Sequence, residues 1–308
     1  MASVHAVTHT RFGTSAAIKI AHRSVLGEQY TPQTFLREAR IVRRVEHPAM
    51  IEIHGTGRCD GRPYLVMERL VGTSLGTRVD AAPMPRGEGI EILLELVDVL
   101  RAAHRAGIVH RDLKLDNVFV CDTPFADGKR IKLLDWGVAH VEGEDDPFRG
   151  LIAGTLTYVA PEQIRGDALT PAADIYSLAV VAYHLLCSRA PFAARTDLEL
   201  IHLHLRAEPP RPNLAWPTIP HELDELLVAM LAKDPGVRPS LDEVEHVLTT
   251  MLARLAPARR PILDDVPTTP PVDMLGRPAV LPCPPLSWAW VGLAGLFAGL
   301  AGLLSALP

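Results

Sequence analysis

The chain opens with short runs in which apolar and polar residues alternate, the period of half-buried β-strands. Residues 4–22 alternate in this way on either side of an Arg-Phe-Gly-Thr turn, which predicts a β-hairpin. Apolar Phe35, Ala39 and Val42 then recur at helical spacing and predict one face of a helix. Residues 63–68 contain several strand-forming side chains, so we expect a further strand there.

From residue 89 onward, most apolar positions recur at helical spacing. Residues 89–106 carry an apolar stripe of about five turns, and Gly107 follows it as a typical helix terminator. Further stripes predict helices at residues 175–186, 223–231 and 244–255. Shorter apolar runs predict strands at residues 118–120 and 131–134.

The last fifty residues have a different pattern. Residues 257–285 contain nine prolines and no sustained periodicity, which is typical of an extended linker. Residues 286–307 contain no charged side chain and as a helix would be ~33 Å long, enough to cross a bilayer. We therefore predict a transmembrane helix; the glycine content of this segment disfavours the alternative, a buried helix of a soluble domain.

Three features of the apolar segment bear on its setting. Trp288 and Trp290 stand at its start, where indoles favour the membrane interface. Gly295 and Gly299 have the G-x-x-x-G spacing that permits close helix–helix approach, which predicts a homodimer. Arg277 precedes the span, so we expect one span in the cell membrane with the larger part of the chain cytoplasmic.

Length, charge and cysteine content narrow the class of protein. At 308 residues the chain exceeds the usual single core, so one large domain with an appendage, or two domains, is expected. A net charge of −5 and a pI near 6.2 argue against a general nucleic-acid binder. The four cysteines lack C-x-x-C spacing, so neither a zinc site nor a disulfide framework is predicted. The first residues lack the pattern of a signal peptide.

Residues 110–117, His-Arg-Asp-Leu-Lys-Leu-Asp-Asn, bring together a candidate base, two cations and a candidate metal ligand. This stretch resembles the H-R-D-x-x-x-x-N catalytic loop of protein kinases. Residues 135–137, Asp-Trp-Gly, resemble the D-F-G triplet, and residues 154–162 resemble G-T-x-x-Y-x-A-P-E. On these motifs the chain is identified as a member of the bacterial, eukaryotic-like Ser/Thr protein kinases.

The resemblance implies an α+β, two-lobed protein-kinase-like fold over residues 1–255, with a small β-rich N-lobe and a larger helical C-lobe. A linker at residues 256–285 and the transmembrane helix at residues 286–307 would complete the chain. The implied partners are ATP and protein substrates, without nucleic acid. The implied metal is Mg²⁺, with Mn²⁺ as an alternative.

The resemblance also assigns roles within the catalytic loop, residues 110–117, and the D-F-G-like triplet. Asp112 would accept the proton of a substrate hydroxyl, and Lys114 would steady the transferred phosphate. Asn117 and Asp135 would bind the metal, and this oxygen ligand set suits Mg²⁺. Trp136 would pack under the helix predicted around residue 38.

Lys19 would grip the α- and β-phosphates of ATP, and Glu38 is placed to pair with it. Such a pair positions the amine and lets the helix act as a switch, because rotation of the helix breaks the contact. The alternatives are a solvated lysine at a strand end and an ordinary exposed helical glutamate.

The adenine-binding positions follow from the same resemblance. Ala17 and Phe119 would contribute to the adenine site, and Met67 would be the gatekeeper. Residues 68–72 would be the hinge, where the Glu68 carbonyl and the Leu70 amide would hydrogen-bond the base. A flexible linker at Gly72 is compatible with this interpretation.

The glycine-rich lid over the phosphates is the missing part of the pattern. Val4 falls where the valine of G-x-G-x-x-G-x-V belongs, and Ala2 takes the place of the third glycine. The first two glycines would precede Met1. We therefore expect that Met1 is an internal methionine taken as the start, and that the N-lobe of this chain lacks its first strand.

The activation loop, residues 138–153, contains no Ser, Thr or Tyr. In kinases, an arginine directly before the catalytic aspartate, the position of Arg111, usually indicates an activation loop that is ordered by a phosphate lying against that arginine. Four carboxylates are available instead, on Glu142, Glu144, Asp145 and Asp146. We predict that an acidic side chain substitutes for the phosphate or that dimerisation orders the loop; a solvated acidic loop without a role is the alternative.

Two further contacts are implied as architectural. Glu162 would form a buried pair with Arg238, and Asp174 would hold the catalytic-loop backbone through hydrogen bonds. Thr155 and Lys114 favour Ser/Thr over Tyr substrates by family resemblance.

The expected function is that of a membrane-anchored Ser/Thr protein kinase that transfers the γ-phosphoryl group of ATP. A catalytically impaired pseudokinase, acting as a tethered binding or scaffold module, is the alternative. A small-molecule phosphotransferase is disfavoured, because residues 154–162 resemble a peptide-substrate platform.

Overall fold

The computed structural model describes residues 2–22, 31–148 and 155–255. The chain divides into two units, residues 1–258 and 259–308, and every described residue belongs to the first. The predicted linker and transmembrane helix lie outside the described residues. Among the helices that the structure describes, none is both long and apolar enough to cross a membrane.

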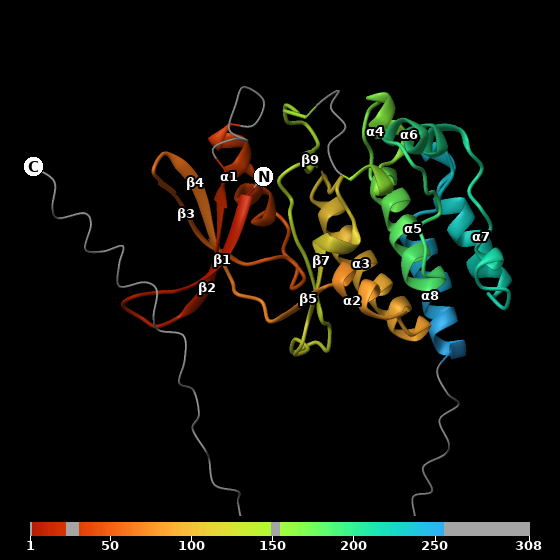
Figure 1. The fold of residues 1–308 in the computed structure, drawn as a ribbon, viewed down its shortest axis with the longest axis horizontal. Coiled ribbons are helices and arrows are strands. Elements are labelled where there is room, and N and C mark those ends of the chain that lie inside the picture. Colours follow the sequence, from red (N-terminus) through yellow and green to blue (C-terminus); the bar gives the residue numbers. More distant parts are fainter. Residues whose placement is uncertain (1, 23–30, 149–154, 256–308) are drawn as a thin grey trace, which may run out of the picture. The chain divides into compact units, whose positions relative to one another are not determined.

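The predicted hairpin and the strands after it form the N-lobe, a four-stranded antiparallel sheet ordered β1-β2-β4-β3. The register pairs Val4 with Lys19 in the hairpin. Phe35 and Ala39 of helix α1 pack with Leu65 of the sheet in a small core, so the face expected from the spacing is the buried one. Figure 1 shows α1 beside this sheet. The elements are β1 (Ala2–Thr8), β2 (Ser15–Ala21), α1 (Pro32–Val42), β3 (Ile53–Cys59) and β4 (Arg62–Met67).

Local sequence fixes where α1 begins. The Thr31 hydroxyl accepts a hydrogen bond from the Thr34 N–H, and Pro32 occupies the first helical position, where its missing N–H costs nothing. Seven of the eleven helical residues are buried, among them Arg37 and Glu38. Burial of two charged side chains on one helix indicates that both have polar partners.

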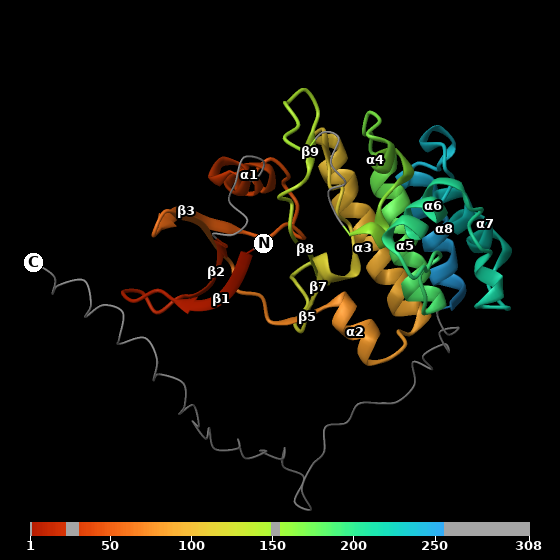
Figure 2. The ribbon, with the colours of Figure 1, turned by 45° about the horizontal axis from the view of Figure 1, so that its top comes forward.

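The C-lobe is mainly helical, and its interior is one large apolar cluster around α3 and α5. Gly107 follows α3 with a φ of 69°, the left-handed conformation that terminates a helix most easily in glycine. Figure 2 shows α5 and α8 beside α3. The helices are α2 (Leu75–Ala81), α3 (Arg86–Arg105), α4 (Pro161–Arg165), α5 (Ala172–Cys187), α6 (Asp197–Arg206), α7 (His221–Met230) and α8 (Leu241–Leu255).

Short strands lie between the sheet of the N-lobe and the helices. They are β5 (Gly72–Ser74), β6 (Ile108–Val109), β7 (Val118–Cys121), β8 (Ile131–Leu133) and β9 (His140–Val141). Strands β5, β7 and β8 form one sheet, and β6 pairs with β9. The Leu133 N–H donates to the Ala49 carbonyl at 2.8 Å, so β8 is joined to the chain segment that enters β3. These strands connect the two lobes and confirm the expected two-lobed α+β fold.

Both architectural contacts expected in the C-lobe are present. Arg238 donates two hydrogen bonds to the Glu162 carboxylate, at 2.6 and 2.8 Å, and both side chains are almost completely buried. The Asp174 carboxylate accepts the backbone N–H groups of His110 and Arg111, at 2.9 and 3.0 Å, and the His104 ring lies 2.8 Å from it. Burial alone would raise the pKa of Asp174, but the nearby histidines and these N–H donors lower it. Asp174 therefore anchors the loop that begins at residue 110.

Candidate active site

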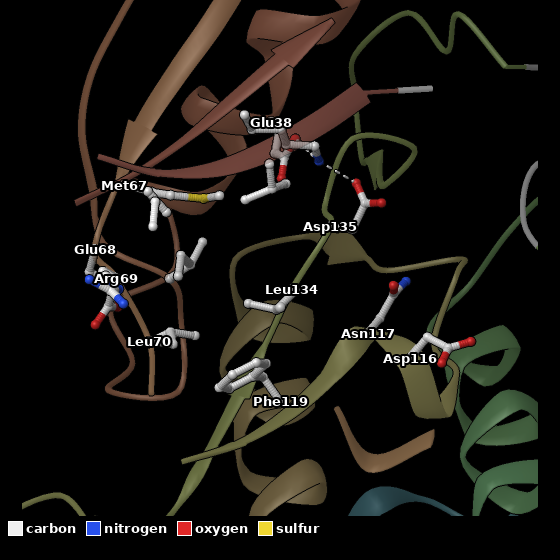
Figure 3. A pocket seen from close by; sticks show the side chains of 15 residues that line it. Glu38, Met67, Glu68, Arg69, Leu70, Asp116, Asn117, Phe119, Leu134 and Asp135 are labelled. Atoms are coloured by element: carbon white, nitrogen blue, oxygen red, sulfur yellow. Dashed lines mark hydrogen bonds and ion pairs between the residues drawn. The ribbon is translucent and has the colours of Figure 1, made fainter. Parts of the chain in front are cut away.

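A cavity of about 370 Å³ opens between the sheet of the N-lobe and strands β7 and β8. Figure 3 shows Met67 and Leu70 on one side of it, Asp135 and Asn117 on the other, and Leu134 and Phe119 between them. Most of the residues predicted for a nucleotide line this cavity. Those residues are Ala17, Lys19, Glu38, Met67, Glu68, Leu70, Asn117, Phe119 and Asp135. Asp112 and Lys114 do not line it.

Lys19 lies at the centre of the polar end of the cavity. Its Nζ donates to Glu38 Oε2 at 2.8 Å and to Asp135 Oδ1 at 2.9 Å. Burial works against the charged amine, but the two carboxylates outweigh it and raise the pKa of Lys19. The same amine lowers the pKa of Asp135 against the effect of burial. The predicted pair with Glu38 is therefore formed, and Lys19 is a fixed cation that links α1 to the D-F-G-like triplet.

The side chain of Asp112 is buried, and its carboxylate oxygens accept three hydrogen bonds. Lys114 Nζ and Asn117 Nδ2 donate to its Oδ2 at 2.9 and 3.0 Å, and the Thr155 N–H donates to its Oδ1 at 3.1 Å. Lys114 Nζ also donates to the Thr155 hydroxyl at 3.0 Å. A carboxylate held by three donors has the fixed orientation that a proton acceptor needs. The contacts join the catalytic loop to the start of residues 155–162.

Asn117 and Asp135 provide the oxygen atoms that a divalent cation would need. The amide nitrogen of Asn117 donates to the Asp112 carbonyl at 2.7 Å and to its carboxylate, so the Asn117 amide oxygen is not engaged there. Asp135 uses one oxygen for Lys19, and half of its side-chain surface remains exposed. Two protein oxygens plus phosphate and water suit Mg²⁺. No cluster of three or more His, Cys, Asp or Glu suited to a metal occurs among the described residues.

Backbone conformation at two points of the site is unusual. Arg111 and Asp135 have φ values of 69° and 59°, in the left-handed region that few non-glycine residues adopt. Gln163 Nε2 holds the Arg111 carbonyl at 3.0 Å, while Asp174 holds its N–H. Strained residues persist only where their surroundings fix them, and such residues concentrate at functional sites.

Trp136, the unusual middle residue of the D-F-G-like triplet, is completely buried. It belongs to the same apolar cluster as Ile41 and Val42 of α1, as expected of a side chain that packs under that helix. Its indole N–H donates to the Leu133 carbonyl at 3.0 Å, and its ring packs edge-on against His110 with centroids 4.4 Å apart. The indole thus satisfies its polar atom inside the core.

The activation loop contacts both the catalytic loop and α1. Arg111 donates to both carboxylate oxygens of Asp146, with one contact at 2.9 Å, so one of the four candidate acids meets this arginine as predicted. Arg37 of α1 donates to the Ala139 carbonyl, and Arg44 lies 2.6 Å from Glu144. Arg111 lowers the pKa of Asp146 against the effect of partial burial.

One buried charge in the site was not expected from the sequence. Lys132 on β8 donates to the Glu68 carboxylate at 2.6 Å and to the Met50 carbonyl at 2.9 Å. The signal was a single lysine inside the apolar run of residues 131–134. Strand alternation assigns it to one face without showing that this face is buried. The hinge residue Glu68 is therefore held through its side chain, in addition to the role predicted for its backbone carbonyl.

A family model described as the protein kinase domain matches residues 1–248. The match covers most of the chain, and the chain belongs to the protein kinase family. It resembles serine/threonine-protein kinase Pkn1 of Myxococcus xanthus, with 32% identity over 90% of this chain and 41% of that protein. It also resembles PknL of Mycobacterium tuberculosis, with 33% identity over 74% of this chain and 56% of PknL. The chain thus spans about half, or less, of the length of these relatives.

Proposed function

We propose that the chain is an ATP-dependent serine/threonine protein kinase that acts at the cell membrane. The observation that carries the activity is the double contact of Lys19 with Glu38 and Asp135. A kinase needs the lysine–glutamate pair and the metal-binding aspartate in place together, and in this chain one amine joins them. The names of the relatives, all serine/threonine-protein kinases, support the choice of acceptor hydroxyl.

In the proposed reaction the oxygen of a substrate Ser or Thr attacks the γ-phosphorus of ATP, and the bond from that phosphorus to the β–γ bridging oxygen breaks to release ADP. Asp112 accepts the proton of the attacking hydroxyl, and Lys114 balances the charge of the phosphoryl group in transit. Lys19 holds the α- and β-phosphates. Mg²⁺ would be held by Asn117 and Asp135 and, when bound, neutralises phosphate charge. Positioning and charge stabilisation supply the catalysis.

The test is phosphoryl transfer by the full chain in detergent micelles with ATP and Mg²⁺, followed by phosphoamino-acid identification. Asp112→Asn should remove activity, whereas the matched Asp122→Asn, at an exposed aspartate directly after β7, should not. Incorporation into serine or threonine supports the proposal. Nucleotide binding by wild type without any transfer would instead make the chain a pseudokinase that acts as a binding module.

The proposed membrane anchor rests on the sequence of residues 286–307. Twenty-two uncharged residues suffice to cross a bilayer, and an arginine near the centre of such a helix is costly. The wild-type chain should remain in bacterial membranes after alkaline carbonate washing. A Leu296→Arg, Leu300→Arg variant should move to the soluble fraction, and equal partition of the two chains would contradict the anchor.

A homodimer through Gly295 and Gly299 is part of the same proposal. Energy transfer between donor- and acceptor-labelled copies in vesicles should fall when both glycines are replaced by isoleucine. Unchanged transfer would exclude this contact.

A further inference from the structure

The hinge residue Glu68 is fixed on its side-chain face as well as along its backbone. Its Oε1 accepts Lys132 Nζ at 2.6 Å and the Glu52 N–H at 2.8 Å. Its own N–H donates to the Glu52 carbonyl at 2.9 Å. Lys132 has a second acceptor, the Met50 carbonyl at 2.9 Å. Four hydrogen bonds therefore connect the hinge, the segment that enters β3 and strand β8.

Strand β8, which carries Lys132, is hydrogen-bonded to its neighbours on both sides. Leu133, the next residue, donates its N–H to the Ala49 carbonyl at 2.8 Å, and β8 pairs with β7. Lys132 is only 7% exposed, and its ammonium lies 5.1 Å from the centre of the Phe125 ring. The amine thus has little freedom to move, and Glu68 is held against a strand that ends two residues before Asp135.

A buried ion pair is weak evidence for stability, because apolar side chains of similar volume often stabilise a protein as well or better. The Lys132 contacts have a geometric consequence instead. The side chain and the N–H of Glu68 are both held, so the position of its Cα and the direction of the bond to its carbonyl carbon are restricted. In the proposed function the carbonyl of Glu68 accepts a hydrogen bond from the 6-amino group of adenine. A fixed carbonyl binds that group without an added ordering cost.

We propose that Lys132 is a positioning residue for nucleotide-base recognition: through the Glu68 carboxylate it fixes the hinge carbonyl that meets the 6-amino group of the purine. The inference rests on the proposed function at this site, and it concerns a side chain that lies outside the ATP cavity. Lys132 contacts neither phosphate nor base and acts only through Glu68.

The experiment compares ATP with purine riboside triphosphate, which lacks only the 6-amino group. Dissociation constants for both nucleotides are measured by calorimetry on the full chain in detergent micelles with Mg²⁺, and this readout does not require turnover. In Lys132→Met, which keeps the length but not the charge, the dissociation constant of ATP should rise about fivefold to tenfold, the size of one hydrogen bond. That of purine riboside triphosphate should change less than twofold.

Three controls separate positioning from general damage. Lys132→Arg retains a cationic donor and should restore the preference for ATP. In a Lys132→Met, Glu68→Gln double variant the preference should be no lower than in Lys132→Met alone, because residues that act as a unit are not additive. Arg101→Met removes a mostly buried arginine that lies 2.6 Å from Glu245 in the C-lobe, and it should leave the preference unchanged.

The outcomes distinguish the inference from the proposed function. Equal weakening of both nucleotides in Lys132→Met, or no weakening, overturns the positioning role. A wild-type chain that binds both nucleotides equally also overturns it, because no 6-amino contact would exist. Selective weakening of ATP supports the role even if the wild-type chain transfers no phosphate, a result that would overturn only the proposed kinase activity.

Discussion

Arg111 grips the carboxylate of Asp146 with both terminal nitrogens, in a loop that offers no hydroxyl side chain between residues 138 and 153. The arginine directly precedes the candidate base, so a resident acid occupies the position where a phosphate would order the loop in many kinases. Glu144 adds a contact to Arg44, just after the end of α1. The described part of the loop, residues 138–148, is thus held against the catalytic loop without any modification of its own side chains.

Asp146→Ala should lower kcat/KM for protein substrate by about 10- to 100-fold, the range of a typical coupling between two sites. Its physical cause is the loss of the anion that holds the loop against Arg111. Asp145→Asn, at the exposed neighbouring acid, is the matched control and should be neutral. Phosphatase treatment of the wild-type enzyme should leave the rate unchanged. A large loss of activity on dephosphorylation would contradict the substitution of acid for phosphate.

Lys19→Met should reduce phosphoryl transfer by about 10²- to 10³-fold, the usual effect of removing one preorganised charge contact. Glu38→Gln should act in the same direction but less, because Asp135 still holds the amine at 2.9 Å. Single-turnover rates at saturating ATP are the measurement. Lys129→Met, which removes a part-exposed lysine that lies beside Asp98, is the control. Equal rates in Glu38→Gln and wild type would show that the pair has no role in catalysis.

Sequence reasoning succeeded where a pattern is local. The spacing of Phe35 and Ala39 predicted the buried face of α1, and the motif residues around Asp112 come together as the resemblance implied. No helix was predicted at α6, because apolar and polar residues alternate there on either side of Ile201 without a clear helical stripe, whereas the Thr196 side chain caps a helix that begins at Asp197.

Contacts between distant segments were harder to predict. The sequence offers four acidic residues as candidate partners of Arg111, and it is the backbone conformation of the loop that brings Asp146 to this arginine. The partner of the buried Lys132 is Glu68 in the hinge, sixty-four residues earlier, and this pairing can be recognised only once the fold has placed the hinge beside β8. The sequence shows which charged side chains are available, whereas the whole fold decides which of them form ion pairs with one another.

Glu162→Gln should lower the free energy of unfolding by ~3–5 kcal/mol, because the buried charge of Arg238 loses its counter-ion. For a domain of this size each kcal/mol corresponds to roughly 2–4 °C in Tm. The control is Glu222→Gln in the half-exposed Glu222–Arg254 pair, where solvent screening should leave Tm nearly unchanged. The rate per folded molecule should remain that of wild type below the transition. A similar Tm for both variants would show that burial does not govern the cost.

His204 should make the stability of the C-lobe pH-dependent. The ring is completely buried, with Nδ1 2.9 Å from the Tyr176 hydroxyl. Burial, and then the charge of Lys233, lower the pKa of His204 to about 4, against roughly 6.5 for an unfolded histidine.

Between these two pKa values the unfolded chain binds more protons than the folded one, so the stabilising contribution is complete above about pH 6.5 and is lost as pH falls towards 4. The slope from this residue should approach ~1.4 kcal/mol per pH unit within the window. Urea unfolding of wild type and His204→Phe at pH 7.5, 6 and 5 provides the measurement. The variant loses the Tyr176 contact at every pH, so only the difference in slope reports the histidine. Parallel slopes in the two proteins would show that His204 does not remain neutral in the fold.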